Sequence, residues 1–410
     1  MPTNPRVPAA ALPAAATAPT ALPAPRLPAA AQLTVALLVA LAVPAVRAAL
    51  AQTPYTPGPG DQWERRRPAA AGMDSARLDS EVRFAQASEI GWLRDMAEQV
   101  RRNTAQEPFP DVLGPTKDRA AQNGIVIRHG YIVAEWGDTR QQVDMTFSVA
   151  KSYLSAVAGL AFDRGLIRDV DERVGASVRD GGFDSPHNSP ITWRMMLTQT
   201  SEWEGTLWEK PDAADRRRGR DRTLQEPGTF WEYNDVRVNR LALALLRAWN
   251  RPLPEVLREM VMDPIGSSPS WEWHGYRTSY LDLIGRRVQS VSGGGHWGGG
   301  VWATTRDHAR FGLLMLRRGR WGERQILSER WMNLAETPTP IRPVYGFLWW
   351  LNADRAQYAA APASSVFALG AGGNVIWIDR EHDLLVVIRW MDTRRINEFM
   401  ALVISALASD

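Results

Sequence analysis

Two short runs of apolar, β-rich residues mark two neighbouring β-strands in the first half of the chain. A helical pattern over residues 75–102 is followed by NGIVIRHGYIVAEWGD, in which residues 125–128 and 131–136 are rich in β-branched and aromatic side chains. The dipeptide His129-Gly130 separates these two runs. Two short β-rich runs joined by two residues of this kind predict a β-hairpin.

The same strand pattern returns near the C-terminus, after a long region of a different kind. Residues 148–335 are dominated by helical periodicity that Gly, Pro and Asp interrupt. The segments YGFLWWL, VFAL, NVIWID and LLVVIRW then show the strand pattern, and an amphipathic helix is expected over residues 395–408. Strands at both ends with helices between them predict an α+β fold, in which sequence-distant segments complete one antiparallel sheet.

The first 51 residues differ in composition from the rest of the chain. They contain no Asp or Glu, and residues 33–46, LTVALLVALAVPAV, form an uncharged apolar run that is short for a membrane span. Arg26 precedes this run and small residues up to Ala51 follow it, an order typical of a secretory signal peptide. We therefore expect cleavage near Ala51, a periplasmic or secreted protein, and no stable membrane span after cleavage. A buried core helix is the alternative explanation of the apolar run.

Charge and cysteine content narrow the classes of function. The chain has 48 Lys and Arg against 45 Asp and Glu, but three of the arginines lie in the first 51 residues, so the mature chain is formally neutral. A neutral chain has no general attraction for polyanions, and no nucleic-acid partner is expected. The absence of Cys excludes disulfides, thiolate zinc sites and a Cys nucleophile. The six histidines lack metal-ligand spacing, so neither a metal nor another cofactor is predicted.

Ser148 and Lys151 stand at the start of the apolar helical run in TFSVAKSYLSAVAGLAFDRG. The chain has only three lysines, and the other two are Lys117 and Lys210. Residues three apart share one face of a helix, about 5 to 6 Å apart at Cβ, so Ser148 Oγ and Lys151 Nζ can meet. A helix N-terminus at Ser148 adds the positive end of the macrodipole. Burial is expected to lower the pKa of Lys151 toward that of a usable base.

A strand-to-helix turn is predicted at residues 146–148, with Thr146 as a candidate helix cap. Ser-x-x-Lys also arises by chance, so the spacing alone is compatible with an ordinary helix start. The scarcity of lysines and the apolar flank favour a catalytic pair.

Four further segments follow this block in order along the chain. They are ITWRMMLTQTSEWEG (191–205), EPGTFWEYNDVRVNRLALALL (226–246), GGGVWATTRDHARFGLLML (298–316) and ALGAGGNVIWIDREHDLLVVI (368–388). Together with the Ser148 block they resemble the motifs of the serine β-lactamase and penicillin-binding-protein superfamily, and most closely its branch of class C β-lactamase-related esterases and aminohexanoate-oligomer hydrolases. The resemblance implies a β-lactamase/transpeptidase-like fold, with an antiparallel sheet flanked by helices and an inserted, mostly helical subdomain. It covers residues 75–410, which are expected to form one hydrolase domain. From composition, residues 1–51 are expected to be a signal peptide with an Ala/Pro-rich extension, and residues 52–74 a linker or wrapping arm.

The resemblance also implies roles for individual residues. Ser148 is then the nucleophile, and Lys151 and Tyr233 move its proton. The backbone N–H groups of Ser148 and Ala371 form the oxyanion hole. Either Asn234 or Asp235, which follow the tyrosine, helps to orient the substrate, and a carboxylate at 235 beside Lys151 favours Tyr233 as the base. Gly370 leaves room for the backbone to approach the substrate.

The last motif departs from the superfamily at Ala368, where members commonly have a Lys or His. By the resemblance, a Lys or His at this position would contact the carboxylate of a β-lactam. Its replacement by Ala368 favours an esterase or amidase that acts on a small-molecule substrate. The alternatives are a non-catalytic protein that binds a cell-wall peptide or another ligand, and a true β-lactamase or DD-peptidase. The sequence leaves the oligomeric state open.

Two other segments have unusual composition, but neither predicts a binding site by itself. SGGGHWGGG contains a formal G-x-G-x-x-G at residues 293–298, but no strand precedes it and no βαβ unit surrounds it, so a dinucleotide site is not expected. By the resemblance this loop lies near the active-site rim, where His296 or Trp297 could contact substrate; a flexible surface loop is the alternative. DAADRRRGRDR (212–222) is expected to be a solvated loop that can edge the cleft.

Overall fold

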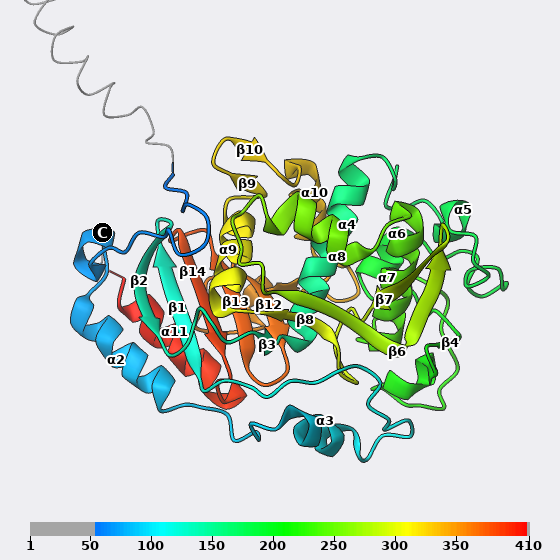
Figure 1. The fold of residues 1–410 in the computed structure, drawn as a ribbon, viewed down its shortest axis with the longest axis horizontal. Helices are drawn as coiled ribbons and strands as arrows, with labels where there is room; N and C mark the ends of the chain where they lie inside the picture. The colour runs from blue at the N-terminus through cyan, green and yellow to red at the C-terminus, as the bar shows by residue number, and fades with distance from the viewer. Residues whose placement is uncertain (1–53, 408–410) are drawn as a thin grey trace, which may run out of the picture. The chain divides into compact units, whose positions relative to one another are not determined.

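The computed structural model describes residues 54–407, so the predicted signal peptide and its cleavage site lie outside the described residues. The described chain contains one large antiparallel sheet, a smaller sheet and the helices that cover them (Figure 1). No helix within residues 54–407 is long and apolar enough to cross a membrane.

The large sheet joins the two ends of the described chain. Its strands, in spatial order, are β11 (Trp350–Leu351), β12 (Val366–Gly370), β13 (Asn374–Asp379), β14 (Leu384–Arg389), β1 (Asn123–Arg128) and β2 (Tyr131–Trp136). All neighbours are antiparallel, and β1 pairs with β14 so that Asn123 faces Arg389. The predicted hairpin and the predicted closure of the sheet by distant segments are both confirmed. His129 and Gly130 form the hairpin turn, with φ of 53° and 84°.

Alternation along the strands gives the large sheet two apolar faces. In β1, Ile125 and Ile127 belong to one core cluster, and Val126 between them belongs to another. The first cluster contains α4 (Ala150–Asp163) and α9 (Thr305–Leu316), and the second contains α2 (Ser75–Gln86) and α11 (Ile396–Ser405). The sheet is therefore covered by helices on both faces, which accounts for the nearly continuous apolar runs of its central strands.

The remaining helices surround α4 and the second sheet. They are α3 (Met96–Thr104), α5 (Val174–Ser177), α6 (Trp193–Leu197), α7 (Asp235–Trp249), α8 (Leu253–Leu257) and α10 (Glu329–Ala335). Short helical turns are η1 (Pro68–Ala71), η2 (Phe147–Val149), η3 (Asp212–Asp215), the π-helical η4 (Arg258–Met262), η5 (Ala353–Arg355) and η6 (Thr393–Arg395). Two small ribbons are β4 (Thr206–Leu207) with β5 (Lys210–Pro211), and β9 (Arg320–Trp321) with β10 (Arg324–Gln325).

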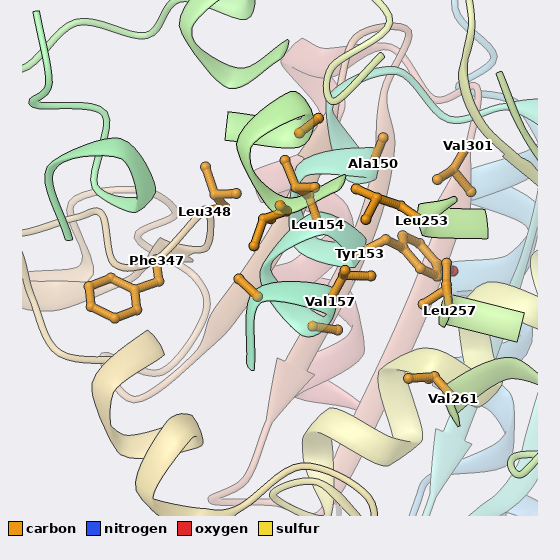
Figure 2. Packing of buried hydrophobic residues seen from close by; sticks show 14 of the residues in the cluster. Ala150, Tyr153, Leu154, Val157, Leu253, Leu257, Val261, Val301, Phe347 and Leu348 are labelled. Atoms are coloured by element: carbon orange, nitrogen blue, oxygen red, sulfur yellow. The ribbon is translucent and has the colours of Figure 1, made fainter. Parts of the chain in front are cut away.

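The helix α4 is the centre of the larger core cluster. All its residues from Ala150 to Phe162 are buried, so it is apolar on every side rather than amphipathic. Figure 2 shows Tyr153, Leu154 and Val157 of α4 among side chains from other elements, including Leu253 and Leu257 of α8. This packing fixes the start of α4, which carries Lys151.

The middle of the chain contains a sheet that the helical pattern did not predict. Its strands, in spatial order, are β3 (Asp144–Met145), β8 (Gly300–Ala303), β6 (Glu272–Leu283) and β7 (Arg286–Val291). The β6–β7 hairpin turns at Ile284 and Gly285, with φ of 46° and 71°. The expectation of a mainly helical region is therefore wrong for residues 272–303. Exposed and intermediate positions interrupt the burial of β6, so its sequence lacks a clean alternation.

The N-terminal part of the described chain contains two shorter helices and a segment that packs against the hairpin. The single helix expected over residues 75–102 is wrong, because α2 ends at Gln86 and α3 begins after Asp95, whose side chain accepts from the N–H of Glu98. Residues 54–74 wrap against the rest of the described chain: Trp63 is 6% exposed and its indole N–H donates to the Gly130 carbonyl at 2.8 Å.

Candidate active site

Ser148 lies on a strained turn between β3 and α4. It is the middle residue of η2, and Phe147 before it has φ of 49°. A bulky residue rarely adopts this left-handed conformation, and such strain persists only where the surroundings hold it. The Phe147 ring is held edge-on by Trp92 and Trp390, with centroids 5.8 and 6.3 Å away. The backbone at Ser148 is therefore fixed by packing.

The cap expected at Thr146 is absent, so that prediction is wrong. The hydroxyl of Thr146 makes no capping hydrogen bond and is buried without a partner. The α-helix itself begins at Ala150, two residues after Ser148. The 3₁₀ turn η2 leads directly into α4, and the packing of Phe147 holds this turn in place.

Lys151 links Ser148 to Asp235. Its Nζ donates to Ser148 Oγ at 2.9 Å and to Asp235 Oδ1 at 2.6 Å. Lys151 and Asp235 are each 1% exposed, so the ion pair is enclosed by protein. The ammonium also lies 4.4 Å from the centroid of the Tyr233 ring. The structure thus brings Ser148, Lys151 and Tyr233 together, and adds Asp235 as the counter-ion of the lysine.

The expected lowering of the Lys151 pKa is wrong in this environment. Burial does lower the pKa of Lys151, but Asp235 and Tyr233, through their charges and the hydrogen bonds to them, together raise it by more, and the net shift is upward. Burial raises the pKa of Asp235, while Lys151, His296 and Arg217 together lower it by more, and its net shift is downward. Both groups are therefore charged at neutral pH, and Lys151 is an ammonium that donates to Ser148.

Asn234 and Asp235, the two residues that were expected to orient the substrate, bind other groups of the protein. Asn234 is 0% exposed, and its side chain caps α7 by accepting from the Arg237 N–H at 3.1 Å and donates to the Asp212 carbonyl at 2.8 Å. Asp235 is engaged by Lys151. Both polar side chains are thus used within the protein, and neither lines the cavity beside Ser148.

The glycine-rich loop at residues 292–300 covers the Lys151–Asp235 pair. A Cβ added at Gly294 would lie 2.2 Å from Asp235 Oδ2 and 2.3 Å from Lys151 Nζ, so only glycine fits. The backbone N–H of His296 donates to the same Asp235 oxygen at 3.1 Å. The sequence reasoning did not identify Gly294 as a site residue, because a run of glycines carries no chemical signature of its own.

The side chains of this loop divide between the cavity and the core. His296 lines the cavity, and its Nε2 lies 2.7 Å from Glu107 Oε1. Burial lowers the pKa of His296, but the hydrogen bond to Glu107 and nearby carboxylates raise it by more, and the net shift is upward. Trp297 is 0% exposed, so the expectation that it could touch substrate is wrong. Apart from the side chain of His296, the loop is buried rather than a flexible surface segment.

The strand β12 passes close to the nucleophile turn. A Cβ at Gly370 would lie 2.3 Å from the Thr146 carbonyl, so glycine is required for this approach. Asn374 Nδ2 donates to the Ala371 carbonyl at 2.6 Å, and Arg389 Nε donates to Asn374 Oδ1 at 2.5 Å. These bonds fix the peptide that follows Ala371, which is next in the chain to the N–H predicted as the second oxyanion donor. Asn374 and Arg389 were not predicted from the sequence.

A cavity of about 870 Å³ opens beside Ser148. Tyr233, Gly370 and Ala371 also line it, whereas Lys151 lies beneath its surface. The other lining residues are Trp92, Asn103, Thr104, Glu107, Phe147, Ala214, Asp215, Arg216, Arg217, Arg218, Arg220, Trp231, Glu232, Gly294, His296, Trp350 and Leu369. Ala368 is 1% exposed and packs in the core cluster, so β12 presents only Leu369 and Gly370 to the cavity. No cluster of three or more His, Cys, Asp or Glu side chains in the described part of the chain could hold a metal ion.

The segment at residues 212–222 forms one wall of this cavity. Asp212 and Asp215 are 4% and 6% exposed, so the expectation of a wholly solvated loop is wrong at these positions. Arg217, Arg218 and Arg220 are exposed. The acidic side chains thus anchor the segment, and the arginines face the opening.

Comparisons with known proteins identify the family and the fold. The family model described as Beta-lactamase matches residues 125–394. A search of curated proteins finds no match. Among solved structures, a putative beta-lactamase from Bacteroides dorei DSM 17855 is similar at 16% identity and a TM-score of 0.53, over 71% of this chain and 94% of that one.

Two other similar structures belong to proteins that are described by activities other than β-lactam hydrolysis. A putative 6-aminohexanoate-dimer hydrolase from Bacillus anthracis has 16% identity and a TM-score of 0.51, over 70% of this chain and 78% of its own. EstCE1, described as a hydrolase with promiscuous acyltransferase activity, has 15% identity and a TM-score of 0.51, over 82% and 100%. At such identities the likeness concerns the fold alone. With a family model that covers most of its length and the corresponding β-lactamase/transpeptidase-like fold, the chain belongs to the beta-lactamase family of serine β-lactamase-like hydrolases.

Proposed function

We propose that this protein is a serine hydrolase that cleaves a small ester or amide through an acyl-enzyme on Ser148. Membership of the beta-lactamase family supports hydrolase chemistry. The observation that carries the proposal is the contact of Lys151 Nζ with both Ser148 Oγ and Asp235 Oδ1, at 2.9 and 2.6 Å, beside a cavity of about 870 Å³. A buried ion pair that donates to a partly exposed serine hydroxyl is costly to maintain for structure alone.

In the proposed reaction Tyr233 enters as a phenolate beside the Lys151 ammonium, takes the proton of the Ser148 hydroxyl and becomes a neutral phenol. Lys151 cannot accept this proton while Asp235 keeps it an ammonium, so it acts by stabilising the Tyr233 phenolate before the transfer and the negative charge that then develops on the Ser148 oxygen. The Ser148 oxygen bonds to the substrate carbonyl carbon, and the N–H groups of Ser148 and Ala371 hold the oxyanion. The carbonyl re-forms as the leaving group departs with the proton from Tyr233. Water then repeats these steps, freeing the acid and restoring Ser148.

The strained turn supports the assignment of Ser148 as the nucleophile. Phe147 keeps a left-handed φ of 49° immediately before it. Strain of this kind concentrates at active sites, because a fixed backbone keeps reacting groups aligned. A serine without a catalytic task would be expected to sit on a relaxed helix start.

The test is hydrolysis of p-nitrophenyl acetate by the wild type and by Ser148→Ala. We expect the variant to lose at least about 10³-fold in kcat/KM. Ser152→Ala is the matched control, because Ser152 lies on the same helix with its hydroxyl bound to the Leu348 carbonyl at 3.0 Å. Unchanged turnover in Ser148→Ala would exclude the proposed nucleophile.

A second candidate function is ligand binding without catalysis. The observation that favours it is Ala368, which is buried and leaves β12 without the cation or imidazole common in the superfamily. The same feature speaks against efficient hydrolysis of β-lactams or D-alanyl peptides. A fluorophosphonate probe and a fluorescent penicillin separate the candidates: an adduct on Ser148 means a reactive nucleophile, and no adduct with either probe favours binding.

We also propose that the protein is exported and acts in the periplasm or outside the cell. The support is the sequence of residues 1–51, with a positive charge, an apolar run and small residues before Gln52. N-terminal sequencing of the mature protein from fractionated cells is the test. A start at or near Gln52 is expected, and an intact N-terminus in the cytoplasmic fraction would contradict export.

A further inference from the structure

The wall formed by residues 212–222 brings four arginines to the cavity beside Ser148. Arg216 is neutralised by Asp212 at 2.6 Å, and Arg217 by Asp215 at 3.0 Å. Within the described residues, the guanidinium groups of Arg218 and Arg220 form no ion pair, although both side chains line the cavity and are exposed. Two of the four positive charges are therefore without a counter-ion in the part of the chain that the structure describes.

The carboxylates that line the same cavity are already engaged. Glu107 accepts from the Trp297 indole at 2.9 Å and contacts His296 at 2.7 Å. Glu232 binds Arg222 at 2.5 Å and also accepts from the backbone N–H of Arg217 and Arg218 at 3.0 and 3.1 Å. The third, Asp215, is paired with Arg217. The excess charge of the cavity is positive, and it lies on the segment that leads to Tyr233.

Two aromatic rings lie near the first of these arginines, Arg218. The guanidinium carbon of Arg218 lies 5.9 Å from the ring centroids of both Phe230 and Trp231. At this distance, near the outer limit of a cation–π contact, the rings attract the guanidinium and leave its N–H groups available to a ligand. A planar fork of this kind suits a carboxylate, which it can bind with two parallel hydrogen bonds.

We propose that the hydrolase selects substrates that carry a carboxylate in addition to the bond it cleaves, and that Arg218 and Arg220 bind this carboxylate. The inference rests on the proposed function, since it concerns the substrate of the same Ser148 site. The proposed carboxylate site also compensates for the uncharged residue at Ala368. The positive charge that β12 lacks is supplied by the segment before Tyr233, so the carboxylate is bound by a different part of the cavity wall.

The experiment compares esters that differ only in charge. One pair is the mono-4-nitrophenyl ester of adipic acid and its neutral methyl ester, which places the carboxylate in the acyl group. The other pair is 3-acetoxybenzoate and its methyl ester, which places it in the leaving group. We expect kcat/KM to be at least about tenfold higher for the anionic member of one pair, mainly through a lower KM, because two charge-assisted hydrogen bonds are gained. Which pair shows the preference tells on which side of the scissile bond the arginines lie.

The double variant Arg218→Gln, Arg220→Gln is expected to reduce that preference to nearly one. The matched control is Arg330→Gln, since Arg330 is exposed, forms no ion pair within residues 54–407 and lies 4.8 Å from a Phe162 ring away from the cavity. It should keep the wild-type preference. Circular dichroism and thermal melts of all variants establish that they fold.

The possible failures can be told apart. If neutral and anionic esters are cleaved equally well in both pairs, or the preference survives in the double variant, the carboxylate site is wrong and the serine hydrolase stands. If no ester is cleaved and no probe labels Ser148, the proposed function fails. Calorimetric binding of 3-acetoxybenzoate and its methyl ester to the wild type and the double variant then decides on the arginines without turnover.

Discussion

Two parts of the active site are built in opposite ways. The Lys151–Asp235 pair is enclosed by α4, α7 and the glycine-rich loop, with each residue 1% exposed. The wall at residues 216–220 is largely exposed, and Arg218 and Arg220 have no counter-ion in the described residues. The buried part fixes protonation states, because low exposure strengthens charge–charge interactions. The exposed part can contact different substrates with little consequence for the stability of the fold.

The largest effect on the buried Lys151–Asp235 pair is expected from removing the lysine. Lys151→Met leaves Asp235 as an unpaired buried carboxylate, and we expect a loss of about 10³-fold in kcat/KM and of about 3–5 kcal/mol in the free energy of unfolding. Ester hydrolysis and denaturant melts measure the two effects. Lys117→Met is the control, because Lys117 is exposed, and it should change neither quantity appreciably. A Lys151→Met protein with wild-type turnover would remove the lysine from the mechanism.

A smaller change to the same region tests its geometry without altering any charge. In Gly294→Ala the added methyl group meets Asp235 Oδ2 at 2.2 Å and Lys151 Nζ at 2.3 Å, so the pair or the loop must move. A displacement of about 1 Å is expected to lower kcat by about 10²-fold. Gly91→Ala is the control, since no atom lies within 4 Å of a Cβ there. If Gly294→Ala is as active as the control variant, the loop does not constrain the pair.

The role of Asp235 predicts a change in pH dependence. Asp235→Asn removes the negative charge that raises the pKa of Lys151, while burial, which lowers that pKa, remains. Lys151 then loses its proton at lower pH than in the wild type, so the alkaline arm of the kcat profile moves to lower pH. We expect kcat at neutral pH to fall about tenfold. Asp221→Asn, at an exposed residue that forms no ion pair in residues 54–407, should keep the wild-type profile. An unmoved alkaline arm in Asp235→Asn would mean that this carboxylate does not set the charge of Lys151.

The exposed wall predicts the smallest effect, a response to salt. Raising the ionic strength from about 0.05 to 0.5 M shortens the Debye length to a few ångströms and weakens exposed ion pairs. Hydrolysis of the preferred anionic ester should fall roughly threefold, and that of its neutral partner should stay constant, because the buried pair is screened much less. Equal responses of the two esters would contradict a carboxylate site on this wall.

Local patterns predicted the large sheet well. The β1–β2 hairpin follows from two strand-like runs around His129-Gly130, and the apolar runs at the C-terminus follow from burial on both faces. The sheet containing β6 was missed, because its twelve residues mix buried, intermediate and exposed positions. The break at residues 87–95 was missed because a helical pattern does not show where the chain turns to meet another strand. Glu89 pairs there with Met391, more than 300 residues away in the chain.

The site was predicted in its chemistry but not in its electrostatics. Ser148 and Lys151 are three residues apart, so helical geometry alone predicts that they meet, and the structure places them 2.9 Å apart. The net pKa shift of Lys151 depends instead on Asp235, which lies 84 residues further along the chain. The same holds for the arginines of the cavity wall. Their spacing along the chain does not reveal which of them find a carboxylate: Arg217 pairs with Asp215, whereas the guanidinium of Arg218 lies near aromatic rings and pairs with no carboxylate in the described chain.

The pairing of β1 with β14 has a consequence for the order in which the chain assembles. Arg128 faces Leu384 across the centre of the large sheet, so the ribosome must make nearly the whole domain before this contact can form. Until then β1 and β2 are a two-stranded ribbon with an open edge, which is marginally stable and able to pair with other chains. A nascent or truncated polypeptide that lacks β14 therefore depends on chaperones, or on late release, to escape aggregation.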